Sequence, residues 1–218
     1  MSLLESDILK GAIFDIDGTL LDSMGAWWDA CRSFFTRYGL YFTDEQGVEL
    51  KEMRLEDSLP MLIKRYELSV TPAEAIGEIK KEVVNAYKTS IPLKPYAKEY
   101  LEKLKRGGVR TAVATSGYKE LCQTAFKRLG VFDLIDEYAF SQEVNKSKEH
   151  PDIYLLAAKR LGAEPNECTV YEDIVAGIKS AKQGGFSACA IYDPSNEGDT
   201  DVLKQCADHY ITGWKALL

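Results

Sequence analysis

The stretch KGAIFDIDGTLLDS, residues 10–23, decides how the rest of the chain is interpreted. Its first part, residues 10–15, is a short apolar run that ends in an acidic residue, which is typical of a buried strand. Asp15 and Asp17 would leave the end of this strand on the same side, because side chains two residues apart share a face. Gly18 permits a tight turn directly after them. An acidic loop is the simple alternative, but a given string with two Asp, a Gly and a Thr at fixed positions occurs by chance only about once in 10⁵ positions.

Downstream of residue 95 the chain alternates between helical and strand patterns. Helices are predicted over 96–106, 118–129, 151–161 and 174–183, and strands over 109–115, 136–140, 168–171 and 187–192, with 209–212 as a candidate last strand. Strands that alternate with helices of about 10 to 15 residues indicate a parallel sheet covered on both faces. The predicted fold class is therefore α/β, with a doubly wound, Rossmann-like parallel sheet that binds ligands at the carboxyl ends of its strands.

The region between the first and second predicted strands interrupts this alternation. It contains no convincing strand and has the pattern of about four helices, one of which should begin at Thr71–Glu74 with a Thr N-cap, Pro at the first helical position and Glu at the third. An insertion at this place would sit over the carboxyl ends of the strands as a cap. We therefore expect a Rossmann-like core of residues 1–21 and 91–218 and an inserted α-helical cap domain of residues 22–90.

A second group of polar residues ends the strand predicted over 109–115. Thr115, Ser116 and Gly117 offer a hydroxyl, backbone N–H groups and a glycine that opens a helix. Such a segment can cradle an anion. Taken alone, it is more simply explained as a turn and a helix N-cap.

Charged residues mark two further places in the predicted core. Lys148 precedes the helix whose first turn holds Pro151, although in isolation a solvated lysine is the simpler interpretation and Lys146 is a competitor. Glu172 and Asp173 end the next strand, where adjacent carboxylates repel each other unless a cation lies between them. By itself, this acidic pair could equally be a structural N-cap.

Together these residues should converge on one crevice, because the carboxyl ends of parallel strands meet at the same edge of a sheet. The set contains a nucleophile, a second carboxyl group for proton transfer, donors for an anion, a cation and ligands for a hard metal. Mg²⁺ prefers a few carboxylates together with phosphate oxygens.

The composition limits the partners of such a site. The 218 residues carry 27 Lys and Arg against 34 Asp and Glu, a formal net charge of −7, which disfavours nucleic acid as a partner. An anionic substrate then requires a locally positive site, which Mg²⁺ and Lys148 would supply.

No apolar window is long enough to cross a membrane. Five cysteines without a CxxC pair predict no disulfide framework, and they favour a reducing, cytoplasmic compartment. We also expect a monomer.

With the motifs together, the chain resembles the haloacid dehalogenase-like hydrolase superfamily, in the beta-phosphoglucomutase and phosphatase-like branch that has a small helical cap. The similarity is strongest at DIDGTLLDS, AVATSG, residues 148–152 and YEDIVAGI. It implies that Asp15 is the nucleophile that forms an aspartyl-phosphate. It implies that Asp17 is the general acid and base, and that its backbone carbonyl binds Mg²⁺.

The resemblance also assigns the remaining residues. It implies that Thr115 and the N–H group of Ser116, in the segment that ends at Gly117, bind the phosphoryl oxygens. Lys148 would neutralise charge on the nucleophile and the phosphate. The metal-binding set would be Asp15, Asp17, Asp173 and Glu172, with Asp173 as a direct ligand and Glu172 in support. The family often has Gly-Lys-Pro around the lysine where this chain has Ser-Lys-Glu, and the spacing to Pro151 favours Lys148 over Lys146.

The predicted function is Mg²⁺-dependent hydrolysis of a phosphomonoester on a small phosphorylated metabolite. A sugar phosphomutase of the beta-phosphoglucomutase type is the alternative, because the segment LKEMRLEDSL, residues 50–59, is similar to its cap segment. A histidine that helps such mutases falls on Trp27 here, and their cap arginine falls on Leu55, so hydrolysis is favoured. A binding protein on an inactive scaffold is a third alternative.

The insertion should choose the substrate. The candidates to face a cleft are Met24, Trp27, Trp28, Lys51, Met53 and Arg54. Trp27, Phe34 and Phe35 recur at helical spacing and are more simply explained as the core of the insertion. A solvated face is the simpler interpretation of Lys51 and Arg54.

Overall fold

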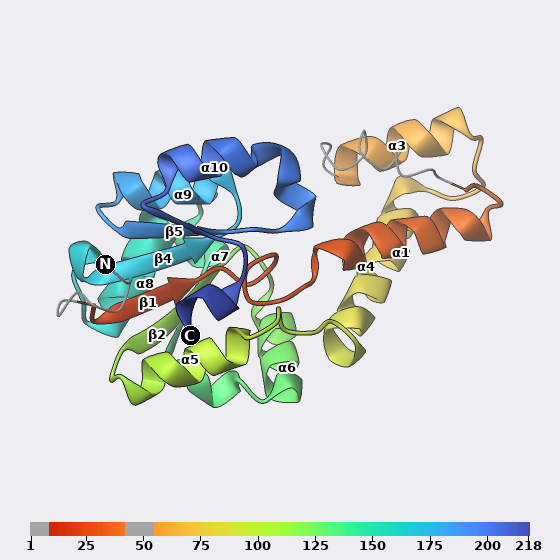
Figure 1. Cartoon of the computed structure of the whole chain (residues 1–218). Coiled ribbons are helices and arrows are strands. Elements are labelled where there is room, and N and C mark those ends of the chain that lie inside the picture. Colours follow the sequence, from red (N-terminus) through yellow and green to blue (C-terminus); the bar gives the residue numbers. More distant parts are fainter. Residues whose placement is uncertain (1–8, 42–54) are drawn as a thin grey trace. The chain divides into compact units, whose positions relative to one another are not determined.

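The computed structural model describes residues 9–41 and 55–218. The chain divides into two compact units (Figure 1). Unit 1 contains Met1–Asp22 and Pro92–Leu218, and unit 2 contains Ser23–Ile91.

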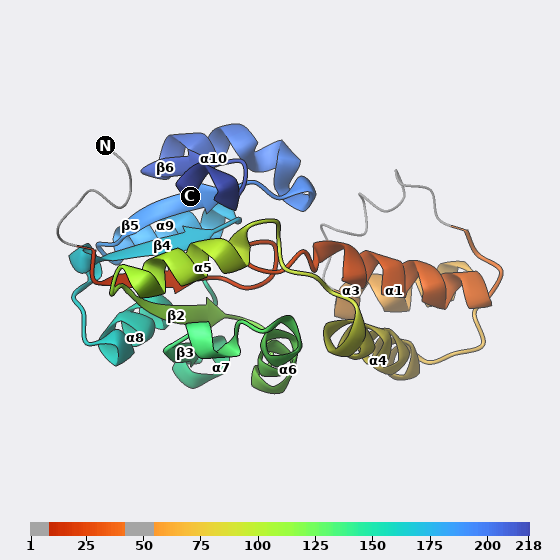
Figure 2. The ribbon, with the colours of Figure 1, turned by 60° about the horizontal axis from the view of Figure 1, so that its bottom comes forward.

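Unit 1 is built on a six-stranded sheet with the strand order β3-β2-β1-β4-β5-β6. The strands are β1 (Gly11–Phe14), β2 (Arg110–Thr115), β3 (Glu137–Phe140), β4 (Cys168–Glu172), β5 (Ser187–Ile191) and β6 (His209–Ile211). All five neighbouring pairs are parallel, and Ile13 of the central strand lies between Ala112 and Val170. Helices cover both faces, as the two views of the ribbon show (Figures 1 and 2). This confirms the predicted doubly wound α/β class.

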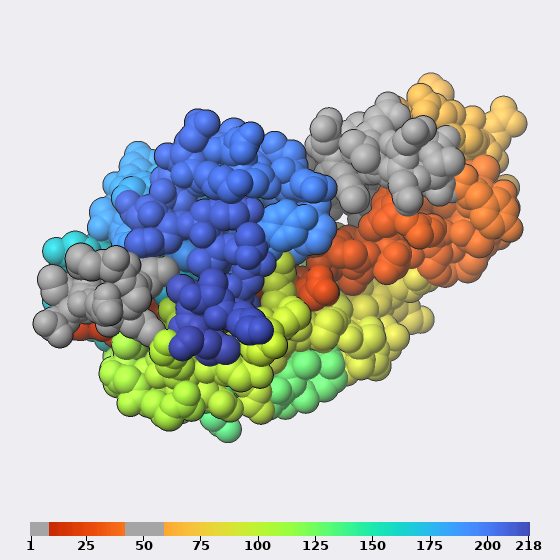
Figure 3. Space-filling view, in the orientation of Figure 1, coloured from red at the N-terminus to blue at the C-terminus, as the bar shows by residue number. Residues whose placement is uncertain are grey.

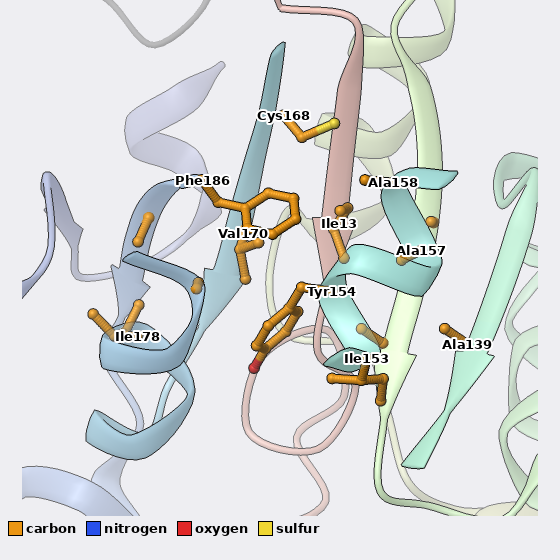
Figure 4. Packing of buried hydrophobic residues seen from close by; sticks show 14 of the residues in the cluster. Ile13, Ala139, Ile153, Tyr154, Ala157, Ala158, Cys168, Val170, Ile178 and Phe186 are labelled. Carbon is orange, nitrogen blue, oxygen red and sulfur yellow. The ribbon is translucent and has the colours of Figure 1, made fainter. Parts of the chain in front are cut away.

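One face of the sheet is covered by α8 (Asp152–Leu161) and α9 (Val175–Gln183). Between these helices and the strands lies a buried hydrophobic cluster (Figure 4) that includes Ile13, Tyr154, Val170, Ile178 and Phe186. Burying one such large side chain stabilises a fold by about 1.5 to 3 kcal/mol. This packing holds α8 and α9 against this face of the sheet.

The other face carries an aromatic cluster. The rings of Phe14 and Tyr171 stack with their centroids 4.8 Å apart, and those of Tyr100 and Trp214 stack at 5.2 Å. Tyr100 belongs to α5 (Ala97–Arg106), against which the short 3-10 helix η4 (Trp214–Leu217) packs. The space-filling view shows this C-terminal segment lying on the surface of unit 1 beside α5 (Figure 3).

The predicted helices and strands of unit 1 agree with the structure to within one or two residues, and α6 (Lys119–Leu129) ends at Gly130, in the left-handed conformation. The sequence patterns did not indicate α7 (Ser141–Val144), α10 (Thr200–Cys206) or the 3-10 helices η1 (Phe132–Leu134), η2 (Pro165–Glu167), η3 (Pro194–Asp199) and η4. These elements are short, so none of them displays a long amphipathic period.

Unit 2 is helical. Its described elements are α1 (Met24–Arg37), α3 (Leu55–Arg65) and α4 (Pro72–Thr89). The predicted start of α4 is confirmed: the Thr71 hydroxyl accepts from the N–H of Glu74, and the Glu74 carboxylate accepts from the N–H of Thr71. Phe34 and Phe35 are buried in α1, as expected for core residues, whereas Trp27 is 38% exposed.

Two expectations from composition can be compared with the described residues. In residues 9–41 and 55–218, no helix combines the length and the apolar character that crossing a membrane requires. The five cysteines are free, which confirms that the chain has no disulfide framework.

Candidate active site

The loop after β1 is wound tightly around Gly18, which has a φ of 85°. The N–H of Gly18 donates to the carbonyl of Leu21 at 3.0 Å, and the N–H of Leu21 donates to the carbonyl of Ile16 at 2.8 Å. A Cβ atom at Gly18 would lie 2.3 Å from Oδ2 of Asp173. Glycine is therefore required twice, once for its backbone conformation and once for this close approach.

Lys148 joins the loop after β1 to the end of β4. Its Nζ forms ion pairs with Oδ1 of Asp15 and with Oε1 of Glu172, and all three side chains are buried. Burial alone would lower the pKa of Lys148, but the two carboxylates raise it above its usual range, so the ammonium stays charged. Lys146, the competing lysine, instead pairs with Asp152 at 2.8 Å in an exposed position.

Glu172 is surrounded by hydrogen-bond donors. Besides Lys148, its Oε1 accepts from the hydroxyl of Tyr154 at 3.0 Å. Its Oε2 accepts from the backbone N–H groups of Asp173 and Ile174 at 3.0 and 3.2 Å. A carboxylate offers about four lone pairs, so these donors nearly saturate Glu172 and fix its orientation.

Asp173 lies beside this pair and is 1% exposed. Its Oδ1 accepts from the hydroxyl of Thr19 at 2.8 Å, and its Oδ2 accepts from Nδ2 of Asn196 at 2.7 Å. Burial, with repulsion from Glu172 as the next cause, raises the pKa of Asp173 to about 7. A nearby cation would therefore stabilise the ionised form of Asp173.

Thr115 is the last residue of β2, and Ser116 and Gly117 begin the turn that follows it. The N–H of Gly117 donates to the Thr115 hydroxyl at 2.9 Å, and the Ser116 hydroxyl lies 3.0 Å from that of Ser141. A Cβ atom at Gly117 would lie 3.2 Å from Oγ1 of Thr115 and 3.5 Å from Oδ2 of Asp17. The carboxyl group of Asp17 is thus next to this turn.

The carboxylate cluster fits a hard metal ion. Asp15, Glu172 and Asp173 each offer one carboxylate oxygen, and these oxygens lie within 4.8 Å of one another. Burial and the neighbouring carboxylates raise the pKa of Asp15, while Lys148 opposes them. Lys148 contributes one positive charge against the three carboxylates of this cluster, so a divalent cation would balance the site better than Lys148 alone.

The structure thus places the predicted site residues at the carboxyl ends of β1, β2 and β4, in the last strand residue or the loop that follows it, and on the loop before α8. Three further residues, Thr19, Tyr154 and Asn196, contact the carboxylates and were not singled out from the sequence. Thr19 belongs to the Asp-x-Asp-Gly-Thr string and could have been found there, whereas Tyr154 and Asn196 carry no local signal.

The candidates for substrate choice belong to unit 2. Lys51, Met53 and Arg54 lie outside the described residues. Trp28 lies under the guanidinium of Arg32, whose Cζ is 5.4 Å from the ring centre.

Comparison with known proteins identifies the family. A family model of haloacid dehalogenase-like hydrolases matches residues 9–185, most of the chain. The chain belongs to this family. It is therefore a hydrolase.

Two relatives of this haloacid dehalogenase-like hydrolase are named as phosphatases. The phosphorylated carbohydrates phosphatase of Thermotoga maritima is 27% identical over 82% of this chain and 82% of its own length. Hexitol phosphatase A of Escherichia coli (strain K12) is 30% identical over 86% of this chain and 85% of its own length.

The fold of this chain is similar to that of a solved structure from Thermotoga maritima, which is provisionally described as a beta-phosphoglucomutase. Its TM-score is 0.86 at 25% identity, and the similarity covers 96% of this chain and 97% of that chain.

Proposed function

We propose that this protein is a Mg²⁺-dependent phosphatase that hydrolyses a small phosphorylated metabolite, with sugar and sugar-alcohol phosphates as the first candidates. One observation carries the proposal. The buried carboxylate of Asp15, at the carboxyl end of β1, is paired with Lys148, and one of its oxygens lies within 4.8 Å of a carboxylate oxygen of Asp173. The names of two relatives support this substrate class. One is called a phosphorylated carbohydrates phosphatase, and the other is called hexitol phosphatase A.

The proposed reaction uses Asp15 as nucleophile. A carboxylate attacks a phosphate dianion poorly, because the two negative charges repel each other. The ammonium of Lys148 lowers this repulsion at the attacking group. A Mg²⁺ ion held by Asp15, Asp173 and the backbone carbonyl of Asp17, with Glu172 in support, would supply further charge neutralisation to the phosphoryl oxygens.

Proton transfer falls to Asp17. In the first step an oxygen of Asp15 forms a bond to phosphorus, the ester P–O bond breaks, and protonated Asp17 gives its proton to the leaving oxygen. In the second step water attacks the phosphorus of the aspartyl-phosphate, Asp17 takes the proton from that water, and Asp15 is released with inorganic phosphate. Thr115 and the N–H of Ser116 hold the phosphoryl oxygens during both steps.

Glu172 has a different role in this proposal from that of Asp173. Four donors already occupy its carboxylate, and one of them is Lys148. Its main contribution is to hold Lys148 against Asp15, and its support of the metal ion is indirect.

The proposal also includes a cap of residues 22–90 that selects the substrate, a monomeric state and a cytoplasmic location.

The test is phosphate release from a panel of hexose, hexitol, nucleoside and carboxylic-acid phosphates, with Mg²⁺ or with excess EDTA. We expect turnover of at least one sugar or sugar-alcohol phosphate that EDTA abolishes. Turnover that persists in excess EDTA would contradict metal dependence. Interconversion of beta-glucose 1-phosphate and glucose 6-phosphate without phosphate release, in an assay primed with a bisphosphate sugar, would instead show a mutase.

A further inference from the structure

The turn after β5 reaches the carboxylate of Asp173. Asn196 lies in η3 (Pro194–Asp199), and its Nδ2 donates to Oδ2 of Asp173 at 2.7 Å and to the backbone carbonyl of Asp173 at 3.3 Å. The two residues are 23 positions apart in the sequence. One amide group therefore holds both the side chain and the main chain of Asp173.

A second donor holds Asp173 from another loop. The Thr19 hydroxyl donates to Oδ1 at 2.8 Å, so each carboxylate oxygen accepts one side-chain hydrogen bond. Gly18 presses against the same carboxylate, leaving no space for a Cβ atom. The carboxylate is thus oriented before any cation arrives. Outer hydrogen bonds of this kind orient metal-ligating carboxylates and tune their affinity.

The turn that carries Asn196 is itself anchored. Oδ1 of Asp193 accepts from the N–H of Ser195 at 2.9 Å, and the backbone N–H of Asn196 donates to the Asp193 carbonyl at 3.0 Å. Oδ2 of Asp193 pairs with Nζ of Lys94 at 2.7 Å, and Lys94 also donates to the carbonyl of Tyr192 at 2.9 Å. Asp193 is 2% exposed, so this pair is well shielded from water. Asn196 is therefore presented to Asp173 by a fixed turn.

From these contacts we propose that Asn196 is a positioning residue for Asp173 and sets the affinity of the site for Mg²⁺. The inference rests on the proposed function, because it takes Asp173 as a metal ligand. Asn196 acts through Asp173 and has no part in the chemical steps. Without this amide the Asp173 carboxylate keeps its bond from Thr19 but can rotate over a wider range, so binding of the ion must then also restrict that rotation.

The experiment measures Mg²⁺ binding to the substrate-free protein by isothermal titration calorimetry, and KM and kcat at saturating Mg²⁺. The variants are Asn196→Ala and Asn196→Leu, the second of which keeps a side chain of similar size without a donor. Asn166→Ala is the matched control, because Asn166 is exposed in η2, just before β4. We expect the Mg²⁺ Kd to rise by roughly 10- to 100-fold in both Asn196 variants, with KM at saturating Mg²⁺ and the control unchanged.

The outcomes separate this inference from the proposed function. A wild-type protein that binds no Mg²⁺ contradicts the proposed function. Normal Mg²⁺ binding by the wild type with an unchanged Kd in the Asn196 variants contradicts the role of Asn196 alone. A raised Kd in Asn196→Ala but not in Asn196→Leu would show that side-chain volume matters and the donor does not. Loss of the folded state in both variants would show a structural role. Either of these last two results would also overturn the inference.

Discussion

Gly177, in the first turn of α9, should be one of the most sensitive small residues of the site. A Cβ atom there would lie 2.6 Å from Cδ of Glu172, 2.7 Å from its Oε1 and 2.8 Å from the Tyr154 hydroxyl. Favourable contacts between carbon atoms begin at about 3.5 Å. In Gly177→Ala, the Glu172 carboxyl group must therefore retreat by about 1 Å.

The cost of this retreat follows from what holds Glu172. Moving the carboxylate weakens its bonds to Lys148 and Tyr154, and each hydrogen bond to a charged group contributes about 1.5 to 3 kcal/mol. The better helix propensity of alanine returns at most about 1 kcal/mol. We expect the free energy of unfolding to fall by about 2 kcal/mol or more. Misplacing Lys148 by about 1 Å should lower kcat by about 10²-fold.

Gly77 provides the matched control. It lies in α4, and a Cβ atom there would have no neighbour within 4 Å. Gly77→Ala should raise the free energy of unfolding by about 1 kcal/mol and leave kcat unchanged. Urea unfolding followed by far-UV circular dichroism, with phosphate release on the same samples, measures both effects. A Gly177→Ala variant that is as stable and as active as Gly77→Ala would refute the crowding around Glu172.

Three further predictions concern single carboxylates. Asp15→Asn should abolish phosphate release while the thermal melt keeps a cooperative transition, because an amide is not a nucleophile; substantial turnover by this variant would remove Asp15 from the role. Asp173→Ala should weaken Mg²⁺ binding in a calorimetric titration and lower the rate of phosphate release by orders of magnitude. The metal-free variant should be as stable as the wild type, because repulsion between Asp173 and Glu172 is relieved. Unchanged Mg²⁺ dependence would exclude Asp173 as a ligand. Hydrogen bonds from Arg160 lower the pKa of Glu143 below its ordinary value of 4.5, so this pair should stabilise the fold above that pH and lose its contribution as the pH falls further. Melting temperatures of Glu143→Gln should fall less steeply with acid than those of the wild type, and parallel curves would contradict the pairing.

The core of the fold was predictable because its strands have strong local signals. Buried parallel strands appear as short apolar runs, and most of the intervening helices stop at glycines such as Gly130 and Gly162. The meeting of Asp15 with Asp173 then follows from topology, since the carboxyl ends of parallel strands share one edge. Short elements such as α7 and α10 depend on tertiary contacts and left no periodic pattern.

The supporting residues of the site could not be predicted in the same way. Tyr154 is apolar in pattern, because its ring packs in the buried cluster of α8 while only its hydroxyl reaches Glu172. Asn196 lies in a polar turn, where asparagine is common for local reasons. Only the folded chain shows that these two polar groups contact the carboxylates at the carboxyl end of β4.

The central claim is that Asp15 carries the phosphoryl group between the two steps. The direct measurement is rapid acid quenching of the enzyme during turnover, followed by peptide mass spectrometry, in the wild type and in Asp15→Asn. The proposed mechanism predicts one added phosphoryl group on the peptide that contains Asp15, with none in Asp15→Asn. Phosphate release at the wild-type rate with no phosphorylated peptide, or a phosphoryl group on another residue, would contradict it.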